Sequence, residues 1–195
     1  MGFYIHVQET PNPAAVKFIS QYTVKAQGKS NYHEVEEAAH NGLATKLFGL
    51  GGVKTLFFFD NYITVTRTDD ADWDDLAETI LDLLQDELPK HNPSYEDPVS
   101  DSGPSVEVED TPEVAEINEI LDRTVRPYLQ ADGGGITVQK REEHRVYVRY
   151  EGACGSCPSS MGGTLMAIQS ILREEIDPDI EVIETGEAGQ MFAMW

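Results

Sequence analysis

The sequence has few cysteines, few basic residues and no long apolar run, and each shortage excludes a class of protein. Two cysteines among 195 residues are too few for the disulfide framework of a small secreted domain. Fourteen basic residues against 35 acidic ones give a net charge of −21, so we expect no nucleic-acid partner. The purely apolar stretch at residues 56–59 is far too short to span a bilayer, so we expect no membrane role.

The first residues of the chain do not have the pattern of an export signal. Residues 1–6 contain no basic segment and no long apolar run, unlike a secretory signal peptide. A protein with so few cysteines and no such signal is typical of a reducing compartment. We therefore expect a cytoplasmic protein.

An acidic segment that contains several prolines divides the chain. Residues 93–112 carry six acidic residues and no Lys or Arg. A segment of this composition cannot bury enough apolar surface to offset the entropy lost on ordering it. We therefore predict a first domain over residues 1–90, a flexible acidic linker over residues 91–111 and a second domain over residues 112–195.

The first domain has the pattern of an α+β fold with an antiparallel sheet. Apolar residues alternate with polar ones in the candidate strands and recur at helical spacing after the N-cap residue Asp72. The predicted elements are strands at Tyr4–Val7 and Val16–Ile19, a helix at Glu34–Leu47, a hairpin of Val53–Phe59 and Tyr62–Thr66, and a helix after Asp72. His33 and His40 lie seven residues apart on the predicted helix without a third ligand, so we expect them to be solvated or in the core.

The second domain is predicted to have elements in the order α-β-β-α-β, again an α+β fold. Thr111 and Pro112 suit the N-cap and the first position of a helix. Pro127 should interrupt that helix, because proline lacks an N–H donor and crowds the preceding turn. The elements that follow are strands at Ile136–Lys140 and Arg145–Tyr150, a helix at Ser160–Ile176 and a short strand at Ile180–Ile183.

The two cysteines of the chain, Cys154 and Cys157, form one Cys-x-x-Cys motif between a predicted strand and a predicted helix. A helix N-terminus favours thiolate over thiol, and thiolate is the form that binds metal or attacks a disulfide. Gly152 and Gly155 let the backbone approach a bulky cluster and leave amides to bond its sulfides. Two thiolates hold only half of the usual four-ligand set of a zinc or iron–sulfur site.

Three interpretations of this motif compete. A thiol–disulfide oxidoreductase of the thioredoxin type would carry its motif after a βαβ unit, whereas a hairpin precedes the motif here. A zinc site could take two cysteines from each of two chains, since His144 falls in the opposite hairpin turn. A [4Fe–4S] cluster bridging two chains, each giving Cys154 and Cys157, would also receive four thiolates. No catalytic triad, carboxylate pair or phosphate-binding loop stands out, so we expect that the chain is not an enzyme.

The cysteine segment resembles the C-terminal domain of NifU-like (Nfu) proteins. The resemblance lies in Arg126–Gly134, which reads Arg-Pro-Tyr-Leu-Gln-Ala-Asp-Gly-Gly, and in Gly152–Ser160, which reads Gly-Ala-Cys-Gly-Ser-Cys-Pro-Ser-Ser. The first half resembles the Nfu N-terminal domain at Glu9–Pro13, Gly52–Phe57, Ile63–Thr66 and Asp72-Trp73. One departure is Gly135, where the family usually has an acidic residue, and we do not expect it to affect cluster binding.

The resemblance implies an iron–sulfur cluster scaffold or carrier. Such proteins bind a [4Fe–4S] cluster between two subunits through paired motifs, here Cys154 and Cys157, so a homodimer is implied for the cluster-bound form. They accept the cluster from an upstream assembly scaffold and pass it to apo client proteins. The N-terminal domain, which has no cysteine, is then a docking module for donors or recipients.

Overall fold

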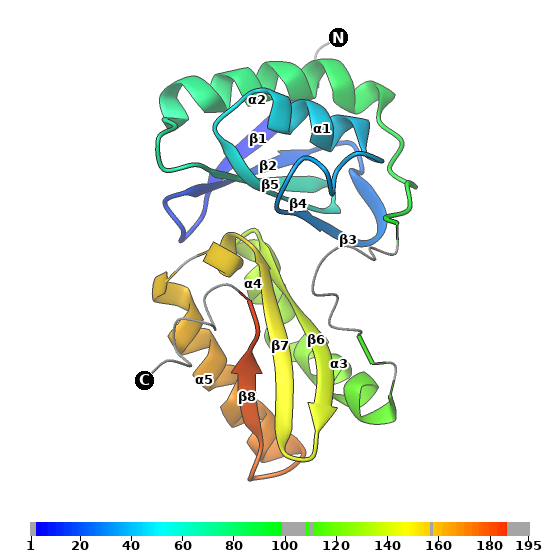
Figure 1. Ribbon diagram of the computed structural model, residues 1–195, viewed down its shortest axis with the longest axis vertical. Helices are drawn as coiled ribbons and strands as arrows, with labels where there is room; N and C mark the ends of the chain where they lie inside the picture. Colours follow the sequence, from blue (N-terminus) through cyan, green and yellow to red (C-terminus); the bar gives the residue numbers. More distant parts are fainter. Residues whose placement is uncertain (1–2, 99–107, 110, 157, 187–195) are drawn as a thin grey trace. The chain divides into compact units, whose positions relative to one another are not determined.

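The computed structural model describes residues 3–98, 108–109, 111–156 and 158–186, with the backbone alone for residues 156 and 158–161. The chain separates into an N-terminal unit, Met1–Gly103, and a C-terminal unit, Pro104–Trp195 (Figure 1). Each unit contains helices and an antiparallel or mixed sheet, so the predicted α+β class and the two-domain architecture are confirmed. Among the described helices, none combines the length and the apolar character needed to cross a membrane.

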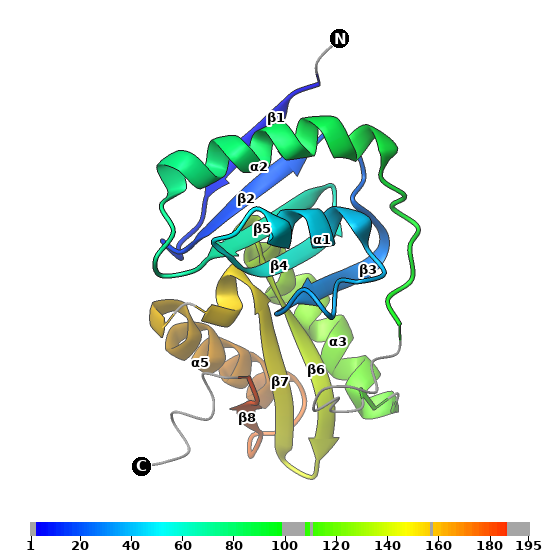
Figure 2. The same cartoon turned by 45° about the horizontal axis from the view of Figure 1, so that its top comes forward.

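The N-terminal unit is a five-stranded antiparallel sheet in the order β1-β2-β5-β4-β3. The strands are β1 (Ile5–Glu9), β2 (Ala15–Ser20), β3 (Lys25–Tyr32), β4 (Val53–Asp60) and β5 (Tyr62–Arg67). The helices are α1 (Gly42–Gly49) and α2 (Trp73–Glu87), followed by the short 3₁₀ turn η1 (Leu88–Lys90). Figures 1 and 2 show α1 and α2 on the same face of this sheet.

The core of this unit follows the predicted patterns. Leu76, Ile80 and Leu84 recur at helical spacing on α2 and face the sheet. They are buried in the same core as Phe58 of β4. The side chain of Asp72 accepts a 3.0 Å hydrogen bond from the Asp74 amide and so begins α2 as predicted. The hairpin of β4 and β5 also lies where the sequence placed it.

Two features of the N-terminal unit differ from the prediction. The helix predicted from Glu34 begins only at Gly42, because the side chain of Asn41 caps it by accepting hydrogen bonds from the Leu43 and Ala44 amides. The strand β3 was not predicted at all. Its sequence is mostly polar, and Gly28 has a φ of 67° in a bulged part of the pairing with β4, so no regular alternation marks it.

The C-terminal unit has the predicted order α-β-β-α-β, with the first helix in two pieces. Its elements are α3 (Pro112–Thr124), α4 (Arg126–Ala131), β6 (Gly134–Glu142), β7 (Arg145–Gly152), the 3₁₀ turn η2 (Ala153–Ser156), α5 (Pro158–Glu175) and β8 (Glu181–Glu184). The break between α3 and α4 lies just before Pro127, as expected for a residue without an N–H donor.

The three strands of the C-terminal unit pair in the order β6-β7-β8. The β6–β7 pair is antiparallel and the β7–β8 pair is parallel, so α5 is the crossover between them. Figures 1 and 2 show α3 and α5 on the same face of the sheet. Ile117, Leu121, Ile168 and Leu172 of these helices are fully buried against the sheet.

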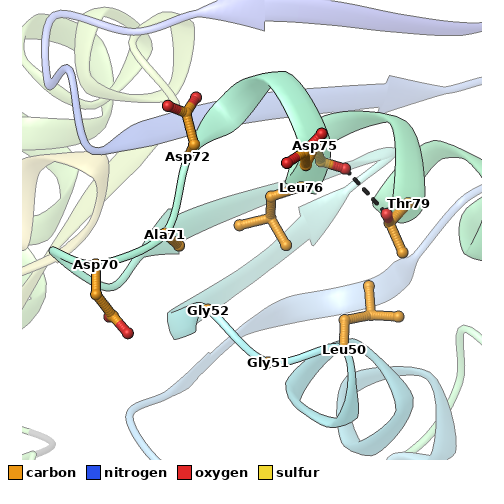
Figure 3. Close-up of a pocket in the computed structure, with 9 residues that line it drawn as sticks. All are labelled: Leu50, Gly51, Gly52, Asp70, Ala71, Asp72, Asp75, Leu76 and Thr79. Carbon is orange, nitrogen blue, oxygen red and sulfur yellow. Dashed lines mark hydrogen bonds between the residues drawn. The ribbon is translucent and has the colours of Figure 1, made fainter.

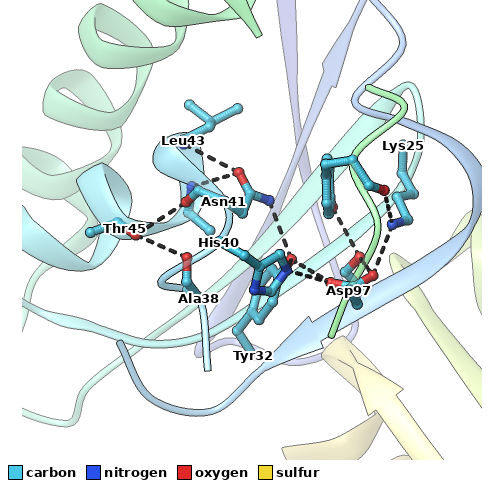
Figure 4. A network of polar contacts seen from close by, with 11 residues as sticks. Lys25, Tyr32, Ala38, His40, Asn41, Leu43, Thr45 and Asp97 are labelled. Atoms are coloured by element: carbon cyan, nitrogen blue, oxygen red, sulfur yellow. Dashed lines mark hydrogen bonds and ion pairs between the residues drawn. The ribbon is translucent and has the colours of Figure 1, made fainter. Parts of the chain in front are cut away.

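The first part of the predicted linker is bonded to the N-terminal unit. The Asp97 carboxylate accepts hydrogen bonds from Lys25 Nζ (2.8 Å), Ser30 Oγ (2.6 Å) and the Tyr32 hydroxyl (2.8 Å), and its Oδ1 lies 2.9 Å from His40 Nε2 (Figure 4). Residues 91–98 therefore lie on the edge strand β3 rather than apart from the sheet. Residues 99–107 and 110 are outside the described residues, so the flexible linker itself stays a prediction.

Candidate functional site

The cysteine motif lies where the sequence placed it, between the end of a strand and the start of a helix. Cys154 is in η2, directly after β7 and before α5, and only 6% of it is exposed. Cys157 is outside the described residues, so its part in the site stays a prediction. The site is therefore built here from Cys154 and the groups around it.

Gly134, at the start of β6, lies against the Cys154 side chain. A Cβ atom added to Gly134 would lie 2.4 Å from Cys154 Sγ and 2.9 Å from its backbone nitrogen, closer than any real contact. Gly134 pairs with Gly152, the last residue of β7, so two residues without side chains face each other beside the cysteine. The missing Cβ leaves a recess on β6 that the cysteine sulfur fills.

The cysteine loop is shaped by glycines with unusual backbone geometry. Gly133 and Gly152 have φ values of 77° and 62°, which side-chain-bearing residues rarely adopt. The Ala153 amide donates a 3.2 Å hydrogen bond to the Gly133 carbonyl, which ties the loop to the strand beside it. A Cβ on Gly155 would lie 3.1 Å from the Tyr150 carbonyl oxygen, so the loop also turns back closely onto β7.

Two buried side-chain oxygens in the C-terminal unit, one on Tyr150 and one on Glu184, were not anticipated. Tyr150 of β7 is 4% exposed, and its hydroxyl has no hydrogen-bond partner among the described residues. Burial raises the pKa of Tyr150 well above its ordinary value, and negative charge on Cys154 and Glu184 raises it further. Glu184 of β8 accepts a 2.7 Å bond from the Gly186 amide through Oε1, while its Oε2 is buried without a partner in the described structure.

The alternation of buried residues along β7 was the one sequence signal for Tyr150. Val146, Val148 and Tyr150 share one side of the strand and are all buried. Nothing in the sequence marked Glu184, because its position depends on the parallel pairing of β8 with β7 across α5.

The two histidines considered as ligands, His144 and His40, have partners other than the cysteine. His144 precedes β7 while Cys154 follows it, so the length of the strand separates them. His144 instead pairs with Asp177, its Nδ1 lying 2.9 Å from Oδ2. His40 lies before α1 rather than on a helix and faces Asp97 and the Tyr32 hydroxyl. Within the described part of the C-terminal unit, His144 is therefore not brought to the cysteine site.

The described residues around Cys154 suit a thiolate-bound metal centre, but one chain would supply only part of its ligand set. The chemistry of the donor set is soft, because a buried cysteine in a loop of small residues would present sulfur and backbone amides to iron or zinc. The Gly134 recess seats that sulfur, and the Tyr150 hydroxyl is a buried donor with no partner in the described chain. If both cysteines of the motif bind, Cys154 and Cys157 would give one chain two of the four ligands that such a centre takes.

The N-terminal unit has a separate surface hollow of about 300 Å³, between the α1–β4 turn and the start of α2. Figure 3 shows Leu50 and Leu76 beside it, with the carboxylates of Asp70, Asp72 and Asp75 around them. The hollow contains neither a cysteine nor a histidine, so it is no candidate for a soft metal.

Two family models match the chain. The model described as "Scaffold protein Nfu/NifU N terminal" matches residues 5–91, and the model described as "NifU-like domain" matches residues 117–183. The second match includes both cysteines.

Several curated proteins are similar over most of the chain. The human protein "NFU1 iron-sulfur cluster scaffold homolog, mitochondrial" is 35% identical over 186 residues, which cover 93% of this chain and 71% of that protein. Proteins of the same name from Drosophila ananassae and Drosophila sechellia are each 31% identical, and the chain spans 64% and 65% of their lengths. These names are of scaffolds and not of enzymes, which agrees with the expectation of a non-enzyme.

Two solved structures are similar over part of the chain. A solution structure of a NifU-like protein from Saccharomyces cerevisiae is 26% identical, with a TM-score of 0.42, and the match covers 46% of this chain and 81% of that one. A crystal structure of a Staphylococcus aureus protein is 20% identical, with a TM-score of 0.38, and the match covers 43% and 99%.

The expected cytoplasmic location is wrong. The human and Drosophila relatives are all named as mitochondrial proteins, which points to the mitochondrion instead. The shortage of cysteines, on which the expectation was based, indicates a reducing compartment but does not identify which one.

Proposed function

Because the chain belongs to the Nfu family of iron–sulfur cluster scaffold proteins, we propose that two copies hold one [4Fe–4S] cluster between them and pass it to apo client proteins. Cys154 and Cys157 of each copy would be the ligands. The observation that carries this proposal is the seating of Cys154 in the Gly134 recess at a strand-to-helix junction. We propose that cluster binding and transfer occur in the mitochondrion, the compartment given in the relatives' names.

The need for a second copy follows from the ligand count. A cubane cluster takes four protein ligands, and this chain has two cysteines. His144, the histidine of the same unit, lies at the far end of β7 from Cys154, so the simplest source of two further thiolates is a second copy of the same motif. A homodimer would then form around its cargo.

A cluster held in this way suits delivery rather than permanent retention. Each copy would contribute two ligands from one loop, so the dimer could open and release its cargo without unfolding either unit. A client thiolate would replace a carrier thiolate, and the sulfur of Cys154 would be left in its recess. We propose that the N-terminal unit docks donors and clients, because it contains no cysteine and has its own core.

The oxidoreductase and zinc alternatives make different predictions about the same cysteines. A dithiol enzyme needs both cysteines of one chain to form a reversible internal disulfide and needs no second copy. The hairpin of β6 and β7 before the motif is unlike the βαβ unit that precedes a thioredoxin motif. No observation favours either alternative over the bridged cluster.

The test is anaerobic reconstitution with iron and sulfide, followed by native mass spectrometry and Mössbauer spectroscopy of the full chain. We expect a dimer with one [4Fe–4S] cluster, and loss of the cluster in Cys154→Ala and in Cys157→Ala. The Gly163→Ala variant is a control, because an added Cβ there meets nothing within 4 Å. A cluster-free monomer with a reversible disulfide would contradict the proposal and favour the oxidoreductase, whereas a dimer that retains only zinc would favour the zinc site.

A further inference from the structure

Tyr150 is a buried residue whose hydroxyl forms no hydrogen bond with the described residues. Its ring packs in the same apolar core as Cys154, and its exposed fraction is 4%. Leaving a buried hydroxyl without a partner costs about 1–3 kcal/mol, so a purely structural position would favour phenylalanine. The hydroxyl is therefore a donor whose partner is not among the described atoms.

Two groups lie close enough to influence this hydroxyl. Negative charge on either Cys154 or Glu184 raises the pKa of Tyr150, in addition to the larger effect of burial. A phenol donates a single hydrogen bond, so it can serve one of the two at a time. Neither bond is formed among the described residues.

The packing of the core favours Cys154 as the eventual partner. Tyr150 and Cys154 are buried in the same apolar core, which does not include the half-buried Glu184. The cysteine is itself fixed on its other side by Gly134. Glu184 already accepts the Gly186 amide through one of its oxygens. Figure 1 shows β8, which carries Glu184, alongside β7.

On the basis of the proposed function, we propose that the Tyr150 hydroxyl donates a hydrogen bond to the Cys154 sulfur when that sulfur is an iron-bound thiolate. A neutral thiol is only a weak acceptor for such a bond. A thiolate carries negative charge, and charge-assisted hydrogen bonds are roughly twice as strong as neutral ones. Hydrogen bonds to cluster sulfurs stabilise the reduced, more negative state. Tyr150 thus sets how firmly the carrier holds its cargo and at what potential the cargo is reduced.

The test compares Tyr150→Phe with Tyr147→Phe in the full chain. Tyr147 lies on the same strand but faces the other side, where its ring is 4.7 Å from Lys140 Nζ, so it is a matched control. After reconstitution, we expect Tyr150→Phe to lower the cluster's reduction potential and to speed cluster loss to an iron chelator about tenfold. Without the cluster, the variant should unfold at the same temperature as the parent chain or at a higher one. Tyr147→Phe should change neither the potential nor the rate of loss.

Three results would overturn the inference. The first is that both chains take up a cluster, and that the cluster of Tyr150→Phe has the same reduction potential and the same rate of loss as that of the parent chain. The second is a cluster-free Tyr150→Phe variant of clearly lower stability, because the hydroxyl would then have a structural partner. The third is loss of the Tyr150→Phe effect in a Glu184→Gln background, because the hydroxyl would then act through the carboxylate. A parent chain that takes up no cluster would instead contradict the proposed function, and this inference with it.

Discussion

The Nζ of Lys25 lies 2.8 Å from the carboxylate of Asp97, although 72 residues separate the two in the chain. The lysine is only 6% exposed, and it also donates to the Tyr95 carbonyl and lies over the Tyr95 ring. A buried ammonium needs an opposite charge close by. Residues 91–98, expected to belong to a flexible linker, supply that charge to β3.

Replacing the carboxylate should loosen this attachment. We expect Asp97→Asn to destabilise the N-terminal unit by about 1–3 kcal/mol, because Lys25 and the Tyr32 hydroxyl would lose their charged acceptor. Urea unfolding of the full chain, followed by fluorescence, would measure the change. The control is Glu96→Gln, which removes the same charge from the adjacent, exposed residue. Equal effects of the two variants would show that net charge, and not the contact, matters.

The same carboxylate should make stability depend on pH. Burial by itself raises the pKa of Asp97, but hydrogen bonds from Lys25, Ser30, Tyr32 and His40 outweigh it, so the pKa lies below the ordinary value of 3.8. The unfolded chain therefore binds this proton more readily than the folded chain does. The stabilisation is complete above the ordinary value and is lost as the pH falls through the lowered one.

Comparison of two chains isolates this contribution from that of the other carboxylates. The free energy of unfolding of the parent chain should fall more steeply below about pH 4 than that of Asp97→Asn. Urea midpoints measured at several acidic pH values would give both curves. Parallel curves would mean that Asp97 titrates alike in the folded and unfolded chains.

Filling the recess beside the cysteine should harm both the fold and the site. We expect Gly134→Ala to destabilise the C-terminal unit by about 1–3 kcal/mol, because its Cβ would overlap the Cys154 sulfur. The cluster content after reconstitution should fall with it. Thermal unfolding and iron analysis would report the two effects. Gly163→Ala, on a helix with open space around it, should leave stability unchanged or raise it, and normal cluster content in Gly134→Ala would contradict the role of the recess.

The length of chain between the units should affect delivery. If the N-terminal unit docks clients, deletion of residues 99–107 should slow cluster transfer to a client protein without changing cluster binding. Transfer would be followed by the recovery of client activity over time. A Gly/Ser replacement of the same length is the control for composition. Unchanged transfer in the shortened chain would rule out a tether.

Local signals in the sequence were sufficient for much of the fold. The Asp72 cap, the break before Pro127 and the burial alternation along β7 all act within a few residues, so each could be predicted from its own neighbourhood. The position of Cys154 between β7 and α5 followed from the same kind of signal.

Features that depend on distant contacts could not be predicted in this way. The strand β3 has a polar sequence and gains its place from pairing with β4 and from contacts with Asp97. The Gly134 recess exists only because the start of β6 meets a loop twenty residues later. The unpaired hydroxyl of Tyr150 and its neighbour Glu184 likewise become visible only when β7 and β8 are side by side.

The parallel pairing of β7 with β8 has a consequence for protein synthesis. Arg145–Val148 pair with Glu181–Glu184, and Cys154 lies in the connection between the two strands. A growing chain therefore cannot complete the sheet behind the cysteine loop until residue 184 has left the ribosome. The residues from Cys154 to Glu184 must therefore be made before this pairing can form, so the cysteine is synthesised before the sheet beside it is complete.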